Sequence, residues 1–182
     1  VDYRLAPKTR FPEFLFDVKT AVRFARANAE KYHFDPERFA VMGDSAGAHL
    51  ALMLGFTEGR PEYEGEKYGW AGYSSAAQVI VDLYGPAVFN DKSAEWLKAS
   101  GLQDTTYTGI GEEGSTFMDK ILSFISTDPN MLPLVSPDAY VHKDIPPVLI
   151  MHGEADNIVP VQNSILLAER IRAVCGEDRV DL

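Results

Sequence analysis

The chain has 182 residues, of which 46% are hydrophobic and 24% charged, and its formal net charge is −10. This length and composition are typical of one globular domain with a full core. An acidic surface repels a phosphate backbone, so the charge argues against nucleic acid as a partner. No apolar run approaches the ~18 residues of a membrane span. The single cysteine, Cys175, excludes an internal disulfide.

The first long element is an amphipathic helix. Residues 1–3 have the pattern of a strand end, and a loop follows. Apolar residues then recur at three- and four-residue steps from Phe14 to Tyr32, which predicts a helix with one buried face. The charged residues of this stretch, including Lys19 and Arg23, are expected on its solvated faces.

The most informative segment lies between residues 38 and 57. The apolar run 39–42 has no helical period and predicts a buried strand, whereas the Ala-, Leu- and Met-rich run 49–56 predicts a buried helix. Between them stands Gly-Asp-Ser-Ala-Gly, residues 43–47. A strand that turns into a helix within a few residues holds the middle residue, Ser45, in a strained conformation at the apex of the turn.

This turn predicts a nucleophile elbow made of Gly43, Asp44, Ser45 and Gly47. The two glycines have no Cβ, so neighbouring backbone can pass close to them. Ser45 would then stand exposed above the carboxyl end of the strand. The backbone N–H of Ala46, at the start of the helix, would point at an oxyanion formed there. The alternative is a turn of small residues with no chemistry.

The middle of the chain is harder to interpret. Residues 58–75 are polar and glycine-rich and predict a surface loop, in which the alternating Glu62, Glu64 and Glu66 would form a solvated charge run. The apolar run 79–84 predicts another buried strand, and Gly85-Pro86 ends it.

Residues 86–140 contain no clear strand and form an insertion longer than a connection needs. Short helices are expected at 94–100 and 115–126. The insertion is either a lid over a site or an elaborated crossover.

The last part of the chain resumes the alternation. Residues 147–152 predict a buried strand, Pro160 to Cys175 a helix, and residues 179–182 the start of a further strand. The order of strands and helices predicts an α/β fold in a single domain, with a mostly parallel sheet and helices on both faces.

A serine nucleophile needs a base, and the base needs an acid to orient it. In open parallel sheets the functional residues collect beyond the carboxyl ends of the strands. Asp156 lies four residues beyond the strand that ends at His152, so it is placed to be this acid. Its alternative role is a turn or N-cap residue ahead of Pro160. The chain has no HExxH, no paired cysteines and no Walker loop, so neither a metal nor another cofactor is expected.

Three motifs carry a family resemblance: Tyr3-Arg4-Leu5-Ala6-Pro7, Gly43-Asp44-Ser45-Ala46-Gly47, and His152-Gly153-x-x-Asp156-x-x-Val159-Pro160. In this order they resemble the α/β-hydrolase esterases related to hormone-sensitive lipase, and most closely the bacterial acetyl and feruloyl esterases that act on plant polysaccharides. The resemblance is weakest across 86–140. It implies Ser45 as the nucleophile, the Ala46 N–H as an oxyanion donor and Asp156 as the acid. The implied partner is a small-molecule or carbohydrate ester, cleaved through an acyl-enzyme.

Two parts of that family pattern are absent. No His-Gly-Gly oxyanion segment occurs, and none of the four histidines follows Asp156. His33 is expected to be structural, His49 is expected to pack along its helix, and His142 lies in a loop before a strand, at the wrong end for a base. His152 is the only internal substitute for the base and is expected to shape the Asp156 loop instead. We therefore expect a fragment of a longer hydrolase, truncated at both ends and nearly inactive alone.

Two other functions fit the same motifs. The sequence around Ser45 also resembles the arylformamidases, which cleave a formyl amide. The missing histidine is also compatible with a non-catalytic small-molecule binder, as in the plant gibberellin receptor. The sequence favours no oligomeric state, and it does not distinguish a cytoplasmic from a secreted bacterial protein.

Overall fold

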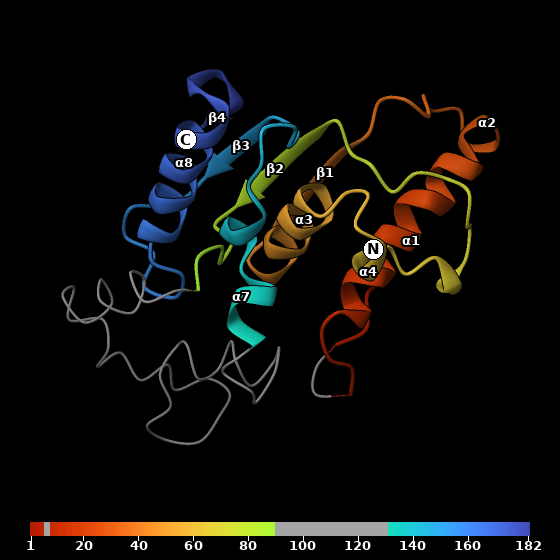
Figure 1. The fold of residues 1–182 in the computed structure, drawn as a ribbon, viewed down its shortest axis with the longest axis horizontal. Helices are drawn as coiled ribbons and strands as arrows, with labels where there is room; N and C mark the ends of the chain where they lie inside the picture. Colours follow the sequence, from red (N-terminus) through yellow and green to blue (C-terminus); the bar gives the residue numbers. More distant parts are fainter. Residues whose placement is uncertain (6–7, 90–130) are drawn as a thin grey trace.

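The computed structural model describes residues 1–5, 8–89 and 131–182. Its centre is a sheet of parallel strands in the order β1-β2-β3-β4 (Figure 1). The strands are β1 (Ala40–Asp44), β2 (Val79–Leu83), β3 (Val148–Met151) and β4 (Val180–Asp181). Since neighbouring strands in space are also neighbours in sequence and all run in parallel, each connection is a crossover. The predicted α/β fold with a parallel sheet is therefore confirmed.

Helices make these crossovers. The described helices are α1 (Glu13–Ala27), α2 (Ala29–Tyr32), α3 (Ala46–Phe56), α4 (Pro61–Glu64), η1 (Glu66–Tyr68), α7 (Leu132–Val135), η4 (Pro137–Tyr140), α8 (Gln162–Cys175) and η5 (Glu177–Arg179). In the described parts of the chain, no helix has the length and apolar character that crossing a bilayer requires. The helix predicted over 14–32 is interrupted at Asn28, whose side-chain amide donates to the Phe24 carbonyl at 2.8 Å.

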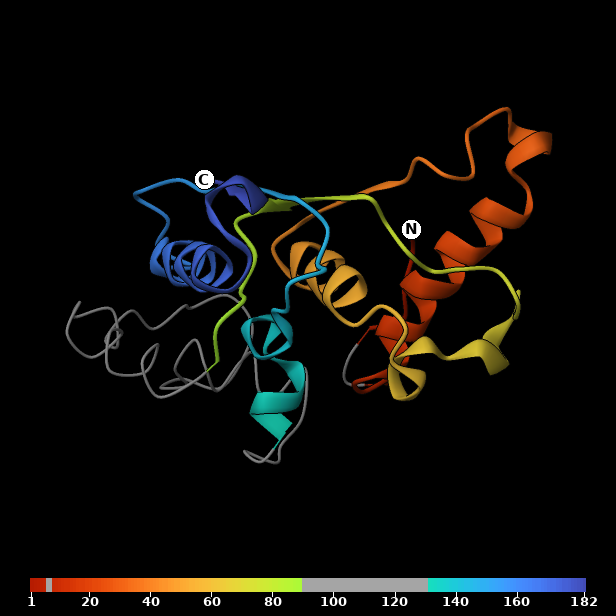
Figure 2. The same cartoon turned by 45° about the horizontal axis from the view of Figure 1, so that its top comes forward.

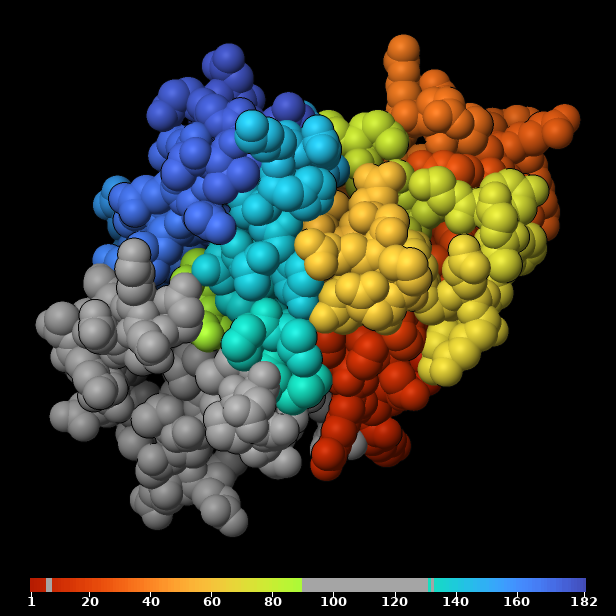
Figure 3. Space-filling model, viewed as in Figure 1, coloured from red at the N-terminus to blue at the C-terminus, as the bar shows by residue number. Residues whose placement is uncertain are grey.

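The described helices cover one face of the sheet. Figure 2 shows α1, α3 and α8 on the same side of the strands, and Figure 3 views the molecule from that side. Ile80 and Ile150 point into this layer and are at most 2% exposed. On the other face Met42 is 70% exposed and Met151 55%. The expected helices on the second face do not occur among the described residues, although the apolar side chains there have the character of a covered surface.

α3 is the central helix of the core. It packs on β1 and β2, and α1 and η4 pack against it. Leu52, Met53 and Phe56 are fully buried. A helix that is apolar on all sides is expected to be surrounded by protein, so the interpretation of 49–56 as a buried helix is confirmed.

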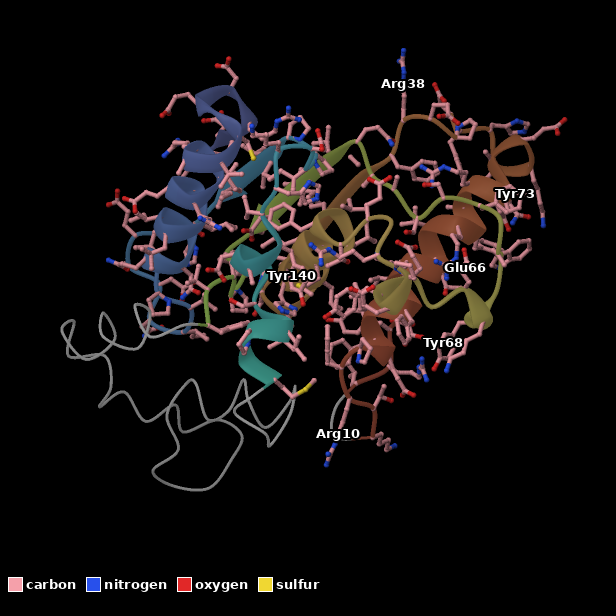
Figure 4. All side chains as sticks on the ribbon, in the orientation of Figure 1. Arg10, Arg38, Glu66, Tyr68, Tyr73 and Tyr140 are labelled. Carbon is pink, nitrogen blue, oxygen red and sulfur yellow. The ribbon has the colours of Figure 1, made fainter. Side chains whose placement is uncertain are left out.

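The prediction of solvated charges was wrong for Lys19, Arg23 and Glu64. Lys19 is 0% exposed and Arg23 1%. The Lys19 ammonium donates to the Thr57 carbonyl and to the Glu64 carboxylate, each at 2.8 Å. The reason is that residues 58–75 fold back along α1. In Figure 4 the labelled Tyr68 of this segment lies beside α1, and its ring stacks on Phe16 with centroids 5.4 Å apart.

The two described ends of the 86–140 insertion lie side by side. The Phe89 N–H donates to the Ser136 hydroxyl at 2.9 Å, and the Asp138 N–H donates to the Ala87 carbonyl at 3.2 Å. Both described ends are part of the hydrophobic core, and the lid over residues 86–140 stays a prediction. The helices expected at 94–100 and 115–126 lie outside the described residues.

Candidate active site

Ser45 occupies the turn between β1 and α3. Its backbone has φ 48° and ψ −117°, a conformation that a non-glycine residue adopts only when its surroundings enforce it. Two backbone hydrogen bonds do so here. The Ser45 N–H donates to the Leu83 carbonyl at the end of β2 (3.0 Å), and the Ser45 carbonyl accepts the His49 N–H in the first turn of α3 (3.1 Å). The apex of the turn therefore lies at the carboxyl edge of the sheet, as predicted from the sequence.

Gly43 is the residue that permits so sharp a turn. A Cβ built on Gly43 would lie 2.3 Å from the carbonyl carbon and oxygen of Gly47, well inside van der Waals contact. The first turn of α3 thus folds directly over the end of β1. Gly47 contributes the backbone that approaches Gly43, but a Cβ added to Gly47 itself would meet only Asp44 Oδ1, at 3.8 Å, and would have room.

Ala46 is the first residue of α3 and is exposed. The first N–H groups of a helix have no partner inside the helix, and the helix dipole adds positive potential there. The Ala46 N–H therefore suits a developing negative charge on a group bonded to Ser45. Asp44 is also exposed, and it lines one groove with Tyr3 and Gly47. Burial, with a smaller contribution from the Asp44 carboxylate, raises the pKa of Tyr3.

Asp156 lies in the loop that leaves the carboxyl end of β3. Its Oδ1 accepts the N–H groups of Ile158 (2.8 Å) and Val159 (3.0 Å), so the loop itself fixes the carboxylate. Its Oδ2 has one long contact, 3.5 Å to His152 Nε2. The side chain is 21% exposed. One carboxylate oxygen is thus held and the other is available to a further donor.

Ser45 and Asp156 follow the carboxyl ends of β1 and β3, with β2 between them. Two strand spacings amount to about 10 Å. An imidazole that bonds to both a serine hydroxyl and a carboxylate spans a gap of this order. The sheet therefore brings the two residues to one edge, at a separation of the order that a bridging base requires.

None of the histidines in the described parts of the chain occupies that gap as a base. His49 is buried, and its Nε2 lies 2.6 Å from the Val135 carbonyl of α7. Burial lowers the pKa of His49 to about 4. His33 is the C-cap of α2, and His142 precedes β3 at the opposite edge. His152 is engaged at both ring nitrogens.

The sequence analysis did not single out Asp82, the fourth residue of β2, as a buried carboxylate. Its side chain is 0% exposed, and its Oδ1 accepts the Gly85 N–H at 2.8 Å. Oδ2 has no hydrogen-bond partner among the described residues. Burial raises the pKa of Asp82 to about 6, although the Gly85 hydrogen bond opposes the shift. One signal in the sequence could have indicated a buried carboxylate: Asp82 stands alone within an apolar strand, where ionisable residues are rare.

The parallel sheet and the strained serine between strand and helix define an α/β-hydrolase. The family model BD-FAE matches residues 1–171, and the chain therefore belongs to the BD-FAE family. This agrees with the family resemblance of the three motifs.

The chain is similar to proteins named as an esterase, a xylanase and a carbohydrate esterase. Esterase LipC of Mycobacterium tuberculosis is 32% identical over 176 residues, which are 96% of this chain and 40% of LipC. Endo-1,4-beta-xylanase B of Butyrivibrio fibrisolvens is 29% identical over 163 residues, which are 87% of this chain and 21% of that protein. A truncated form of a carbohydrate esterase from gut microbiota has a similar structure, with a TM-score of 0.77 and 25% identity over 99% of this chain and 62% of that one. The chain thus spans less than two thirds of the length of each of these relatives, and 40% or less of LipC and of the xylanase.

Proposed function

We propose that Ser45 is the nucleophile of a serine esterase that works through an acyl-enzyme. The observation that carries the proposal is the left-handed backbone of Ser45 between β1 and α3. Such strain at a residue with a nucleophilic side chain is typical of active sites, because it lifts the hydroxyl clear of both elements.

In the proposed reaction, Ser45 Oγ attacks the ester carbonyl while a base takes its proton. The negative charge that develops on the carbonyl oxygen is stabilised by the Ala46 N–H at the start of α3. The alcohol leaves with a proton returned by the base, and water then releases the acid from Ser45. Asp156 holds the base in the right tautomer and orientation through Oδ2, whose long contact with His152 Nε2 (3.5 Å) leaves it able to accept a further hydrogen bond.

The base is proposed to be a histidine of a longer polypeptide that contains this chain. No histidine follows Asp156 in the sequence, and the chain matches only 40% of LipC. A Ser–Asp–His order is the one that this fold uses. We expect the 182 residues alone to hydrolyse esters only at a residual rate, since removing a triad member costs several powers of ten.

For the substrate we propose acetyl or feruloyl esters of plant polysaccharides. The support is the similarity to a xylanase and to a carbohydrate esterase, both named for carbohydrate substrates. The formal net charge of −10 disfavours a phosphorylated ester, which is itself negatively charged.

The test uses the longest natural polypeptide that contains these residues. It is assayed on p-nitrophenyl acetate, methyl ferulate, acetylated xylan and an N-formyl arylamine. Ser45→Ala is expected to reduce kcat at least about 10⁴-fold, and Asp156→Asn by a similar factor. The matched controls are Ser74→Ala and Asp144→Asn, both exposed and away from the carboxyl edge of the sheet.

Ester hydrolysis that survives Ser45→Ala would refute the proposal. Faster cleavage of the formyl amide than of any ester would instead identify an arylformamidase. Binding of these compounds without turnover would identify a non-catalytic binder.

A further inference from the structure

The ring of His152 lies under the Asp156 loop with no exposure to solvent. His152 directly follows β3, and both of its ring nitrogens have close partners. Nδ1 lies 2.7 Å from the Ser164 hydroxyl, and Nε2 lies 2.7 Å from the Val159 carbonyl oxygen. Ser164 is itself fully buried in α8. The ring therefore connects the end of β3, the loop and the start of α8.

These partners determine which nitrogen carries the proton. A carbonyl oxygen can only accept, so Nε2 must carry hydrogen and donate it to Val159. In the neutral ring Nδ1 is then the acceptor, and the Ser164 hydroxyl donates to it. Neither ring nitrogen has a lone pair available for a substrate. His152 is thus not the missing base, in agreement with its expected structural role.

Val159 is the link between this ring and the candidate acid. Its N–H donates to Asp156 Oδ1 at 3.0 Å, while its carbonyl accepts from His152 Nε2 at 2.7 Å. The same residue is therefore held by the histidine through its carbonyl and holds the carboxylate through its N–H. A shift of the Val159 backbone would turn Asp156 Oδ2 away from the direction it now has.

We propose that His152 is a positioning residue for Asp156. Through Val159 it sets the direction in which Oδ2 is presented to the base. The inference rests on the proposed function, because it assumes that Asp156 orients a catalytic base. It adds a residue that never touches the substrate but on which the geometry of the triad depends.

Two substitutions separate this role from simple packing. In His152→Gln the side-chain amide reaches the position of Nε2 and can still donate to Val159. In His152→Asn the shorter amide reaches only the position of Nδ1, so the Val159 link is lost. We expect His152→Gln to keep kcat within about fivefold of the unaltered enzyme. We expect His152→Asn to lower kcat about 100-fold, the effect of a misplacement of about 1 Å, with KM changed less than about twofold.

A double-mutant cycle with Asp156→Asn gives the decisive readout, again in the longest natural polypeptide. If His152 acts through Asp156, His152→Asn causes no further loss of kcat once Asp156 is replaced. If His152 only stabilises the fold, the two losses multiply. Equal activity of His152→Asn and His152→Gln, or multiplying losses, would overturn the inference.

The cycle also distinguishes the proposed acid role of Asp156 from the proposed positioning role of His152. Full activity of Asp156→Asn would refute the acid role in the proposed function. A large loss in Asp156→Asn together with full activity in His152→Asn would refute only the present inference. Should His152→Asn fail to fold, the same cycle is run with Ser164→Ala, which removes the donor that selects the tautomer. A severalfold loss of kcat that disappears in the Asp156→Asn background is then expected, and multiplying losses would again refute the inference.

Discussion

Replacing Glu64 by Gln tests whether a buried ion pair holds residues 58–75 on α1. Glu64 is the carboxylate partner of Lys19, which is 0% exposed, at 2.8 Å. It also approaches Arg23 at 3.5 Å, but Arg23 keeps carbonyl acceptors at Gly65 (3.2 Å) and Gly69 (3.2 Å). Most of the loss therefore falls on Lys19, whose ammonium would remain buried without a countercharge.

Removing one partner of a buried pair typically costs 3–5 kcal/mol. Because the Glu64 side chain is still 17% exposed, we expect the lower end, about 3 kcal/mol. With a urea m-value of about 2 kcal/mol/M, the unfolding midpoint would fall by about 1.5 M. Glu66→Gln is the matched control, since Glu66 is exposed in the adjacent turn, and it should change stability by less than about 0.5 kcal/mol.

The same pair predicts a pH dependence. Burial alone would raise the pKa of Glu64, but hydrogen bonds from Lys19 and Ser75 outweigh it, and the net pKa is lowered. The stabilisation is therefore present above the ordinary pKa of a glutamate and is lost as the pH falls through the lowered value. Glu64→Gln should lack this loss. Equal urea midpoints for Glu64→Gln and Glu66→Gln would refute the reasoning.

Three further outcomes are expected. Gly43→Ala should prevent correct folding of the elbow, because its Cβ would lie 2.3 Å from Gly47 backbone atoms, whereas Gly153→Ala, with no atom within 4 Å, should leave the thermal midpoint unchanged. The pKa of His49 is about 4 in the folded protein and about 6.5 in the unfolded chain, so the unaltered protein should lose about 3 kcal/mol of stability as the pH falls from about 6.5 to 4. His49→Gln should not show this loss. The pKa of Asp82 is about 6 in the folded protein and about 4 in the unfolded chain, so the unaltered protein should gain a similar amount of stability as the pH falls from about 6 to 4. Asp82→Asn should not show this gain. Urea titrations across this pH range would test both, and parallel pH profiles for all proteins would contradict them.

The strands and the elbow could be predicted because their signals are local. The apolar run before Gly43 and the all-apolar helix after Ser45 each encode their own structure, and both are observed. Asp156 could be placed at the correct edge because a parallel sheet carries all carboxyl ends on one side.

The pairing of distant charges could not be predicted. Lys19 and Glu64 are 45 positions apart, and nothing in either local pattern indicates that residues 58–75 return along α1. A lysine within an amphipathic helix is normally solvated, and Lys19 was therefore predicted to be exposed. The lack of helices on the second face of the sheet, among residues 1–5, 8–89 and 131–182, could not be predicted for a related reason, since exposed Met42 and Met151 have the same apolar character as covered residues.

The elbow also explains why the two glycines of the motif differ. The pattern Gly-x-Ser-x-Gly suggests equal roles, but of these two glycines only Gly43 lacks room for a Cβ, because the Gly47 backbone occupies that space. Which of the two glycines has no room for a Cβ depends on how α3 packs over the end of β1, and this cannot be read from the motif alone.

The most direct test of a nucleophilic Ser45 is covalent labelling. The longest natural polypeptide that contains this chain is treated with a fluorophosphonate, digested and examined by mass spectrometry. We predict a single adduct on the peptide that contains Ser45, absent from the Ser45→Ala variant and strongly reduced by Asp156→Asn. A folded protein that takes up no label, or that is labelled at another serine, would contradict the account.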